Sequence, residues 1–164
     1  MARCIIAGVA VTYFLAVIQT TIGEFLMIRG VAPDLLLVWA ICVGLLSGSS
    51  VGALIGFGCG LLEGGLTQMW MGAFAISKAL SGFGAGVLAT KLFKENWAVP
   101  SVAAVVLTLV NEAAFLFVSR AGSGAHAGRI VLVRLIYHAV LAPFMFALTV
   151  RGRRALVGRG EELA

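Results

Sequence analysis

Glycine recurs at every fourth position from Gly44 to Gly64, within a stretch that is otherwise mostly apolar. In water, a glycine inside a helix costs roughly 1 kcal/mol relative to alanine, so a repeated row needs a compensating interaction. In a bilayer, small residues at this spacing let two helix backbones approach closely. The alternative is that glycine is simply commoner in membrane helices. The unbroken register favours a packing seam on the helix that follows the turn at residues 47–50.

The composition indicates an integral membrane protein. The chain has 164 residues, of which 61% are hydrophobic and 12% charged, whereas a soluble domain has about 25% charged residues. The apolar runs are long and do not alternate with polar residues, which favours helices over an outer-membrane barrel. We therefore expect one compact all-α bundle with short loops and no soluble domain.

Charge and cysteine content exclude several other classes. The net charge is +5, but the basic residues lie near the ends of apolar runs, as membrane orientation requires, so we expect no nucleic-acid partner. The three cysteines are odd in number and lie far apart in apolar segments. They predict neither a disulfide framework nor a metal site.

Six spans account for the apolar segments of a single domain over residues 1–150. Pro33 suits the first turn of the second span, and Asp34 suits the positive end of that helix. Pro143 lies inside the last span and is expected to kink it. The expected spans are residues 4–22, 33–47, 51–68, 73–93, 99–118 and 130–150, followed by a basic tail over 151–164.

An even number of spans places both ends of the chain on one side. Loops on the cytoplasmic side carry an excess of Lys and Arg, so we expect both termini in the cytoplasm. The basic tail is expected to contact anionic membrane lipid, with protein binding as the alternative. The cytoplasmic side then carries Arg3, Lys91, Lys94, Arg151, Arg153, Arg154 and Arg159, and the other side carries Arg29, Arg120 and Arg129.

Five ionisable side chains remain inside the spans. Such residues usually face the bundle interior and pair with one another. Matching depths along antiparallel helices predict two ion pairs, Glu63–Lys78 and Glu112–Arg134. If the first pair forms, a Lys78→Gln change should restore part of what Glu63→Gln loses. The fifth ionisable side chain is His138.

The faces of these helices agree with the predicted pairs. Glu63 continues the glycine face of its span, and Lys78 shares a face with two glycines of the next span. These two spans should therefore pack by their glycine faces. Thr108, Asn111 and Glu112 form a polar face expected to lie opposite Arg134, Tyr137 and His138. The predicted packing or partner seam consists of Gly52, Gly56, Gly60, Gly64, Gly82 and Gly86.

The polar core has several possible roles. The favoured hypothesis is that it holds the helices in register; the alternatives are a small-ligand pocket, an ion or proton path, or a surface for a partner's helix. The sequence contains no HExxH, CxxC or Walker A motif and no credible Ser/His/Asp set, so we expect no catalytic residues, no cofactor and no metal.

Three segments carry a resemblance to a known family. PDLLLV, SGSSVGALIGFGCGLLEGG and MGAFAISKALSGFGAGVL resemble the rod shape-determining protein MreD family of bacteria. The resemblance covers about residues 15–93, with Gln19 in a typical place near the end of the first span. Glu63 departs from the family's pattern, in which the acid is aspartate, but the charge is kept.

The resemblance implies a non-enzymatic component of the bacterial inner membrane. Such a protein belongs to the elongation complex, or elongasome, which supports lateral peptidoglycan synthesis and cell shape. The implied partners are MreC and, directly or through it, RodA with its class B transpeptidase and MreB. The implied mechanism is scaffolding, in which a glycine-lined surface docks partner helices.

The main alternative is a substrate-binding subunit of an energy-coupling-factor vitamin transporter. Those proteins have about six spans and an outward pocket, and the charged residues above would suit a small polar ligand. The outer loops are short and hold few aromatic side chains for stacking a vitamin ring, apart from Trp70, which favours the scaffold.

Overall fold

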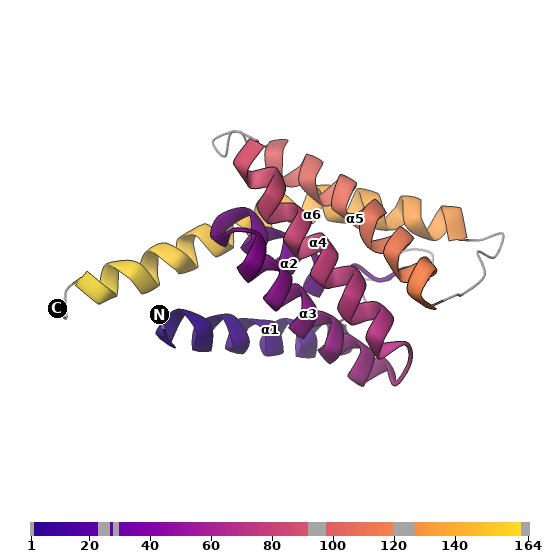
Figure 1. The fold of residues 1–164 in the computed structure, drawn as a ribbon, viewed down its shortest axis with the longest axis horizontal. Helices are drawn as coiled ribbons and strands as arrows, with labels where there is room; N and C mark the ends of the chain where they lie inside the picture. Colours follow the sequence, from indigo (N-terminus) through magenta and orange to yellow (C-terminus); the bar gives the residue numbers. More distant parts are fainter. Residues whose placement is uncertain (1, 23–26, 28–29, 92–97, 120–126, 162–164) are drawn as a thin grey trace.

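The chain folds into six α-helices in the ranges that the structure describes, which are residues 2–22, 27, 30–91, 98–119 and 127–161 of a computed structural model. Arg29, Lys94 and Arg120, on which the expected charge bias also rests, lie outside these ranges. Figure 1 shows the helices as one bundle. The helices are α1 (Ala2–Ile22), α2 (Leu35–Ser47), α3 (Ser49–Thr67), α4 (Met71–Lys91), α5 (Ala98–Ser119) and α6 (Ala127–Glu161).

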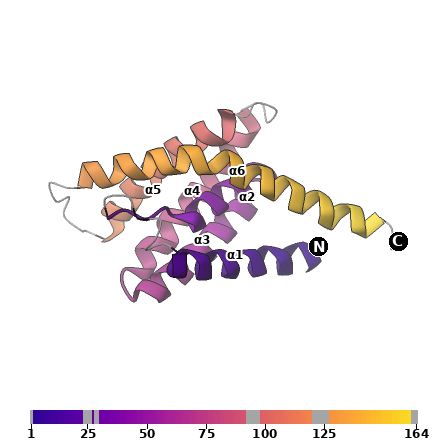
Figure 2. The ribbon, with the colours of Figure 1, turned by 180° about the vertical axis from the view of Figure 1, so that it is seen from behind.

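The helices support a multi-pass membrane bundle. Four of them, α3 to α6, are long and apolar enough to cross a membrane. Large apolar side chains point outward, including Phe117 at 85% and Leu54 at 71% exposure, which suits contact with lipid and not with water. The part of α1 whose side chains the structure describes, Gly8–Thr21, and the 13-residue α2 are shorter. Six complete crossings and the sidedness of the termini therefore stay predictions, although both chain ends lie toward the same end of the bundle in Figures 1 and 2.

Helix α2 lies at the centre of the bundle. Its side chains from Leu35 to Leu45 are all buried, and it contacts each of the other five helices. A helix that is apolar on all faces is stable only when other elements surround it. At about 1.5 Å per residue it is roughly 20 Å long, and its neighbours cover it from Leu35 to Leu45.

Helix α2 begins at Leu35, two residues after the expected start at Pro33, and the segment before it is mostly buried. Val31 and Asp34 are 5% and 7% exposed, and the segment between them is not helical. Irregular backbone within a membrane bundle is tolerated where protein surrounds it. Helix α2 therefore begins inside the bundle.

Helix α6 continues beyond the expected end of the last span. It is helical to Glu161, so the described part of the basic tail extends this helix. The helix changes direction along its length (Figure 2), and Pro143 in its interior removes one backbone hydrogen bond. Near the end of the apolar part, Arg153 Nη1 donates to the Leu46 carbonyl oxygen at 2.7 Å, which satisfies a backbone acceptor at the C-terminus of α2.

Candidate functional site

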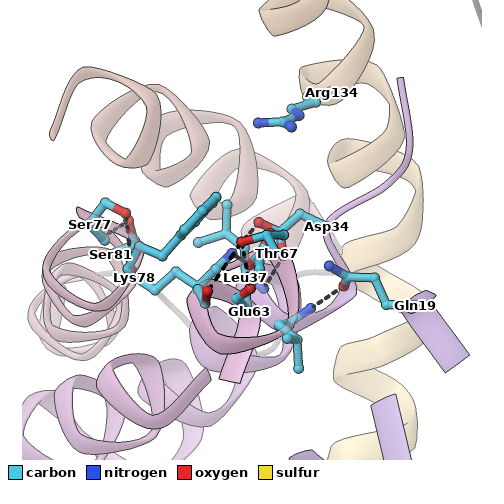
Figure 3. Close-up of polar contacts among 12 residues, drawn as sticks. Gln19, Asp34, Leu37, Glu63, Thr67, Ser77, Lys78, Ser81 and Arg134 are labelled. Carbon is cyan, nitrogen blue, oxygen red and sulfur yellow. Dashed lines mark hydrogen bonds and ion pairs between the residues drawn. The ribbon is translucent and has the colours of Figure 1, made fainter. Parts of the chain in front are cut away.

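A buried lysine is at the centre of the polar contacts. Lys78 on α4 has no exposed surface, and its ammonium group donates to an Asp34 carboxylate oxygen. Its Nζ also lies 2.7 Å from Glu63 Oε2 on α3, so the predicted Glu63–Lys78 contact is present (Figure 3). This second contact is an ion pair without hydrogen-bond geometry, because Glu63 Oε2 has no hydrogen-bond partner. We call Asp34, Glu63 and Lys78 the Lys78 cluster.

Asp34 holds the N-terminus of α2 in place. Its Oδ1 accepts a hydrogen bond of 2.8 Å from the Leu37 backbone N–H, as an N-cap residue does. A carboxylate at this end is stabilised by the helix dipole. The expectation that Pro33 and Asp34 mark a helix start is confirmed for Asp34 as the cap, with Pro33 directly before it.

The three charged residues of the cluster come to one level because of the helix lengths. Asp34 lies 14 residues before the Gly48 turn and Glu63 lies 15 residues after it. Helices α2 and α3 run in opposite directions from that turn at the same rise per residue. The two carboxylates therefore reach the same depth, where Lys78 meets them from α4.

His138 joins the start of α2 to α5. The Asp34 backbone N–H donates to His138 Nε2 at 3.1 Å, and His138 Nδ1 lies 2.8 Å from Thr108 Oγ1. A ring nitrogen that accepts a hydrogen bond carries no hydrogen, so the neutral ring has its hydrogen on Nδ1 and donates it to Thr108. His138 is completely buried and acts here as a neutral connector.

The predicted polar faces of α5 and α6 meet. Arg134 Nη1 donates to Glu112 Oε1 at 2.5 Å, one helical turn from the contact between His138 and Thr108. The second predicted ion pair is therefore present. The arginine side chain is 33% exposed and the glutamate 14%, so this pair is partly hydrated.

Three buried polar atoms of the described residues have no hydrogen-bond partner. They belong to Asn111, which is 5% exposed, and to charged residues of the two ion pairs. Buried polar atoms of this kind are sites where a water molecule or a ligand group is expected. The atoms are Asn111 Oδ1, Arg134 Nε and Glu63 Oε2.

The glycine seam is filled by helices of the same chain. A Cβ atom added to Gly56 would overlap the backbone of Lys78, and one added to Gly60 would overlap the backbone of Phe74 and Ala75. The predicted packing of α3 on α4 by their glycine faces is thus observed. The other seam glycines are equally crowded: Gly52 against Gly82, Gly64 against Met71 and Gly86 against Ser49.

A third helix joins this seam. Gly44 on α2, Gly52 on α3 and Gly82 on α4 meet, since a Cβ on Gly52 would lie 2.6 Å from the Gly44 Cα and would also overlap the Gly82 carbonyl oxygen. No side chain fits between the three backbones. The seam glycines are therefore closed to a partner helix in this fold, which corrects the expectation that the glycine-lined surface docks partners.

Sequence reasoning missed two contributors to the polar core. Asp34 was expected only to cap a helix, although it lies nearly as many residues before Gly48 as Glu63 lies after it. Gln19 on α1 accepts a hydrogen bond of 3.2 Å from the Leu36 backbone N–H, so it satisfies a second donor of the α2 N-terminus that has no partner within the helix.

The described residues hold no group of three or more His, Cys, Asp or Glu side chains placed to bind a metal. Cys42 and Cys59 are buried and are not in a disulfide. The arrangement holds α2, α3 and α4 together through Lys78, and α2, α5 and α6 through His138.

Comparison of the chain with models of known protein families, with curated proteins and with solved structures finds no match. The function is therefore argued from the residues and their geometry.

Proposed function

We propose that this chain is a non-enzymatic membrane scaffold of the bacterial elongation complex, located in the inner membrane. It would bind MreC and, directly or through it, RodA with the class B transpeptidase and MreB. The proposal rests on the resemblance of residues 15–93 to the MreD family. It is supported by one structural observation: the charged side chains of the core contact one another across helices.

That observation favours a structural role over a catalytic one. Lys78 is neutralised from two other helices, and His138 is held at both ring nitrogens. Because the Lys78 ammonium and the His138 ring are held by these contacts, they fix the positions of helices and are not free to attack or protonate a substrate. The rigid bundle would then present its outward apolar faces to partner helices, because the glycine faces are closed.

The test is crosslinking of a tagged copy in the native host, followed by purification and mass spectrometry. A second multi-pass protein with the same tag and abundance serves as control. Recovery of MreC together with RodA and the transpeptidase, above the control, is the expected result. Absence of all three from the crosslinked material would refute the proposal.

A second candidate is a substrate-binding subunit of an energy-coupling-factor transporter. The observation in its favour is the unpartnered Asn111 Oδ1 near the partly exposed Glu112–Arg134 pair, since such atoms can receive a small polar ligand. The same experiment separates the two. Recovery of two ATPases and a membrane coupling subunit would identify the transporter component.

A further inference from the structure

The charges of the Lys78 cluster do not balance. Asp34 and Glu63 supply two carboxylates, whereas Lys78 supplies one ammonium group. The neighbouring Glu112–Arg134 pair balances itself. Uncompensated charge buried between membrane-spanning helices is expensive. Counted over the described residues, the cluster therefore has one more carboxylate than it has cations.

His138 does not supply that charge. Its Nε2 accepts the hydrogen bond from the Asp34 backbone N–H, so this nitrogen has no hydrogen of its own and the ring is neutral. Figure 3 shows Arg134 apart from the cluster, and its guanidinium is engaged by Glu112. Among the residues that the structure describes, Lys78 is therefore the only cation in direct contact with the two carboxylates.

We propose that the Lys78 cluster is a proton-binding site and that Glu63 carries the proton at neutral pH. This inference goes beyond the scaffold function and does not depend on it. The proton converts one carboxylate into a neutral carboxylic acid, which leaves one ammonium opposite one carboxylate. The buried cluster is then neutral.

Glu63 is the proton carrier because Asp34 is better stabilised as an anion. Asp34 accepts hydrogen bonds from both the Leu37 N–H and the Lys78 ammonium, and it lies at a helix N-terminus. Glu63 Oε2 has only the ion-pair contact with Lys78 and no hydrogen bond. Protonation of Glu63 therefore removes fewer stabilising contacts than protonation of Asp34 would.

A proton suits the site better than a metal ion. The described residues offer no group of three metal-ligating side chains, and Lys78 Nζ is already 2.7 Å from Glu63 Oε2. A cation with its own ligand shell needs space and several oxygen ligands. A proton needs neither.

Glu63 is also the member that a proton can reach. Its side chain is 15% exposed, compared with 8% for Asp34 and 0% for Lys78. It lies one helical turn before Thr67, an exposed residue at the end of α3. The distance from Glu63 to Thr67, next to the α3–α4 turn, is about 6 Å along the helix.

The surroundings contain other titratable or charged groups on every packed helix. Helix α1 has Tyr13 within its described side chains, and it is 65% exposed, away from the cluster. The two thiols of α2 and α3 are buried, and Glu112, Arg134 and His138 make the contacts given above. These groups are Tyr13, Cys42, Cys59, Glu112, Arg134, Tyr137 and His138.

Infrared difference spectroscopy tests the proposal on the full chain in lipid nanodiscs. A protonated buried carboxyl group absorbs in a region where carboxylates do not. The expected result is one such band per chain at pH 7, lost in Glu63→Gln and kept in Glu112→Gln. Absence of the band at pH 7 would overturn the proposal.

Isotope labelling identifies the residue without any substitution, in case Glu63→Gln does not fold. Asp34 is the single aspartate of the sequence, so carbon-13 aspartate incorporated by cell-free synthesis reports on it alone. The band should shift with labelled glutamate and stay unchanged with labelled aspartate. A shift with aspartate, or loss of the band in Glu112→Gln, would assign the proton elsewhere and refute Glu63 as its carrier.

Discussion

The Lys78 ammonium group donates to the carboxylate of Asp34, 44 residues earlier in the chain. The contact joins the middle of α4 to the N-terminus of the central helix α2, and both residues are buried. Because the same lysine also contacts Glu63, one side chain connects three helices. Several consequences can be measured.

Replacing Lys78 by methionine should destabilise the protein by about 3–5 kcal/mol, because it leaves the buried Asp34 carboxylate without a cation. Thermal unfolding in detergent measures the change. Arg134→Met is the comparison, and its effect should be smaller because Arg134 is 33% exposed. Equal effects of the two substitutions would contradict the central role of Lys78.

The double substitution Glu63→Gln with Lys78→Gln should not recover stability. The sequence predicts recovery, since it pairs the two residues only with each other, but Lys78 also neutralises Asp34. Removing the lysine leaves Asp34 buried and unpaired, whatever occupies position 63. Adding Asp34→Asn should restore part of the loss. A double variant as stable as Glu63→Gln alone would show that the Asp34 contact contributes little.

Substitution of Gly60 by leucine should disrupt the α3–α4 seam, whereas Gly58→Leu should be tolerated. A side chain at Gly60 meets the backbone of Phe74 and Ala75, but no atom lies within 4 Å of a Cβ at Gly58. Overpacking of this kind costs about 1–3 kcal/mol or more. The abundance of folded protein in membranes and its thermal midpoint measure both. Similar behaviour of the two variants would argue against the seam.

Thr108→Val should cost about 1–3 kcal/mol, because it leaves the buried Nδ1 of His138 without a partner. Thr90→Val is the matched control, since the Thr90 hydroxyl donates only to a carbonyl of its own helix at an exposed position. Chemical or thermal unfolding compares them. No difference between the two would mean that the His138 connection does not stabilise the bundle.

Arg153→Met should lower stability by less than about 1 kcal/mol, because the exposed guanidinium caps one carbonyl at the end of α2. Arg151→Met removes the same charge from an exposed position and is the control. Hydrogen exchange around Gly48 is the more sensitive readout and should rise only in the Arg153 variant. Equal exchange in both would exclude the cap.

The sequence by itself determined the helical membrane class, the glycine seam and the two predicted ion pairs. Three patterns follow the repeat of a single helix, and each lies within one segment of the sequence. They are the glycine spacing, the position of Lys78 on the glycine face of α4, and the polar face of α5. The paired helices are neighbours in the chain, joined by short connections. Register between such neighbours follows from counting residues at a fixed rise, so the contacts Glu63–Lys78 and Glu112–Arg134 were predictable.

Only the tertiary structure decided where α2 lies and what its N-terminus contacts. Asp34 meets Lys78 of α4, and its backbone meets His138 of α6, 104 residues away. No repeat in the sequence encodes contacts between helices that do not follow one another. They arise because a short helix that is apolar on every face is stable only when other helices surround it. Its polar N-cap residue is then buried as well, and it needs buried partners from those helices.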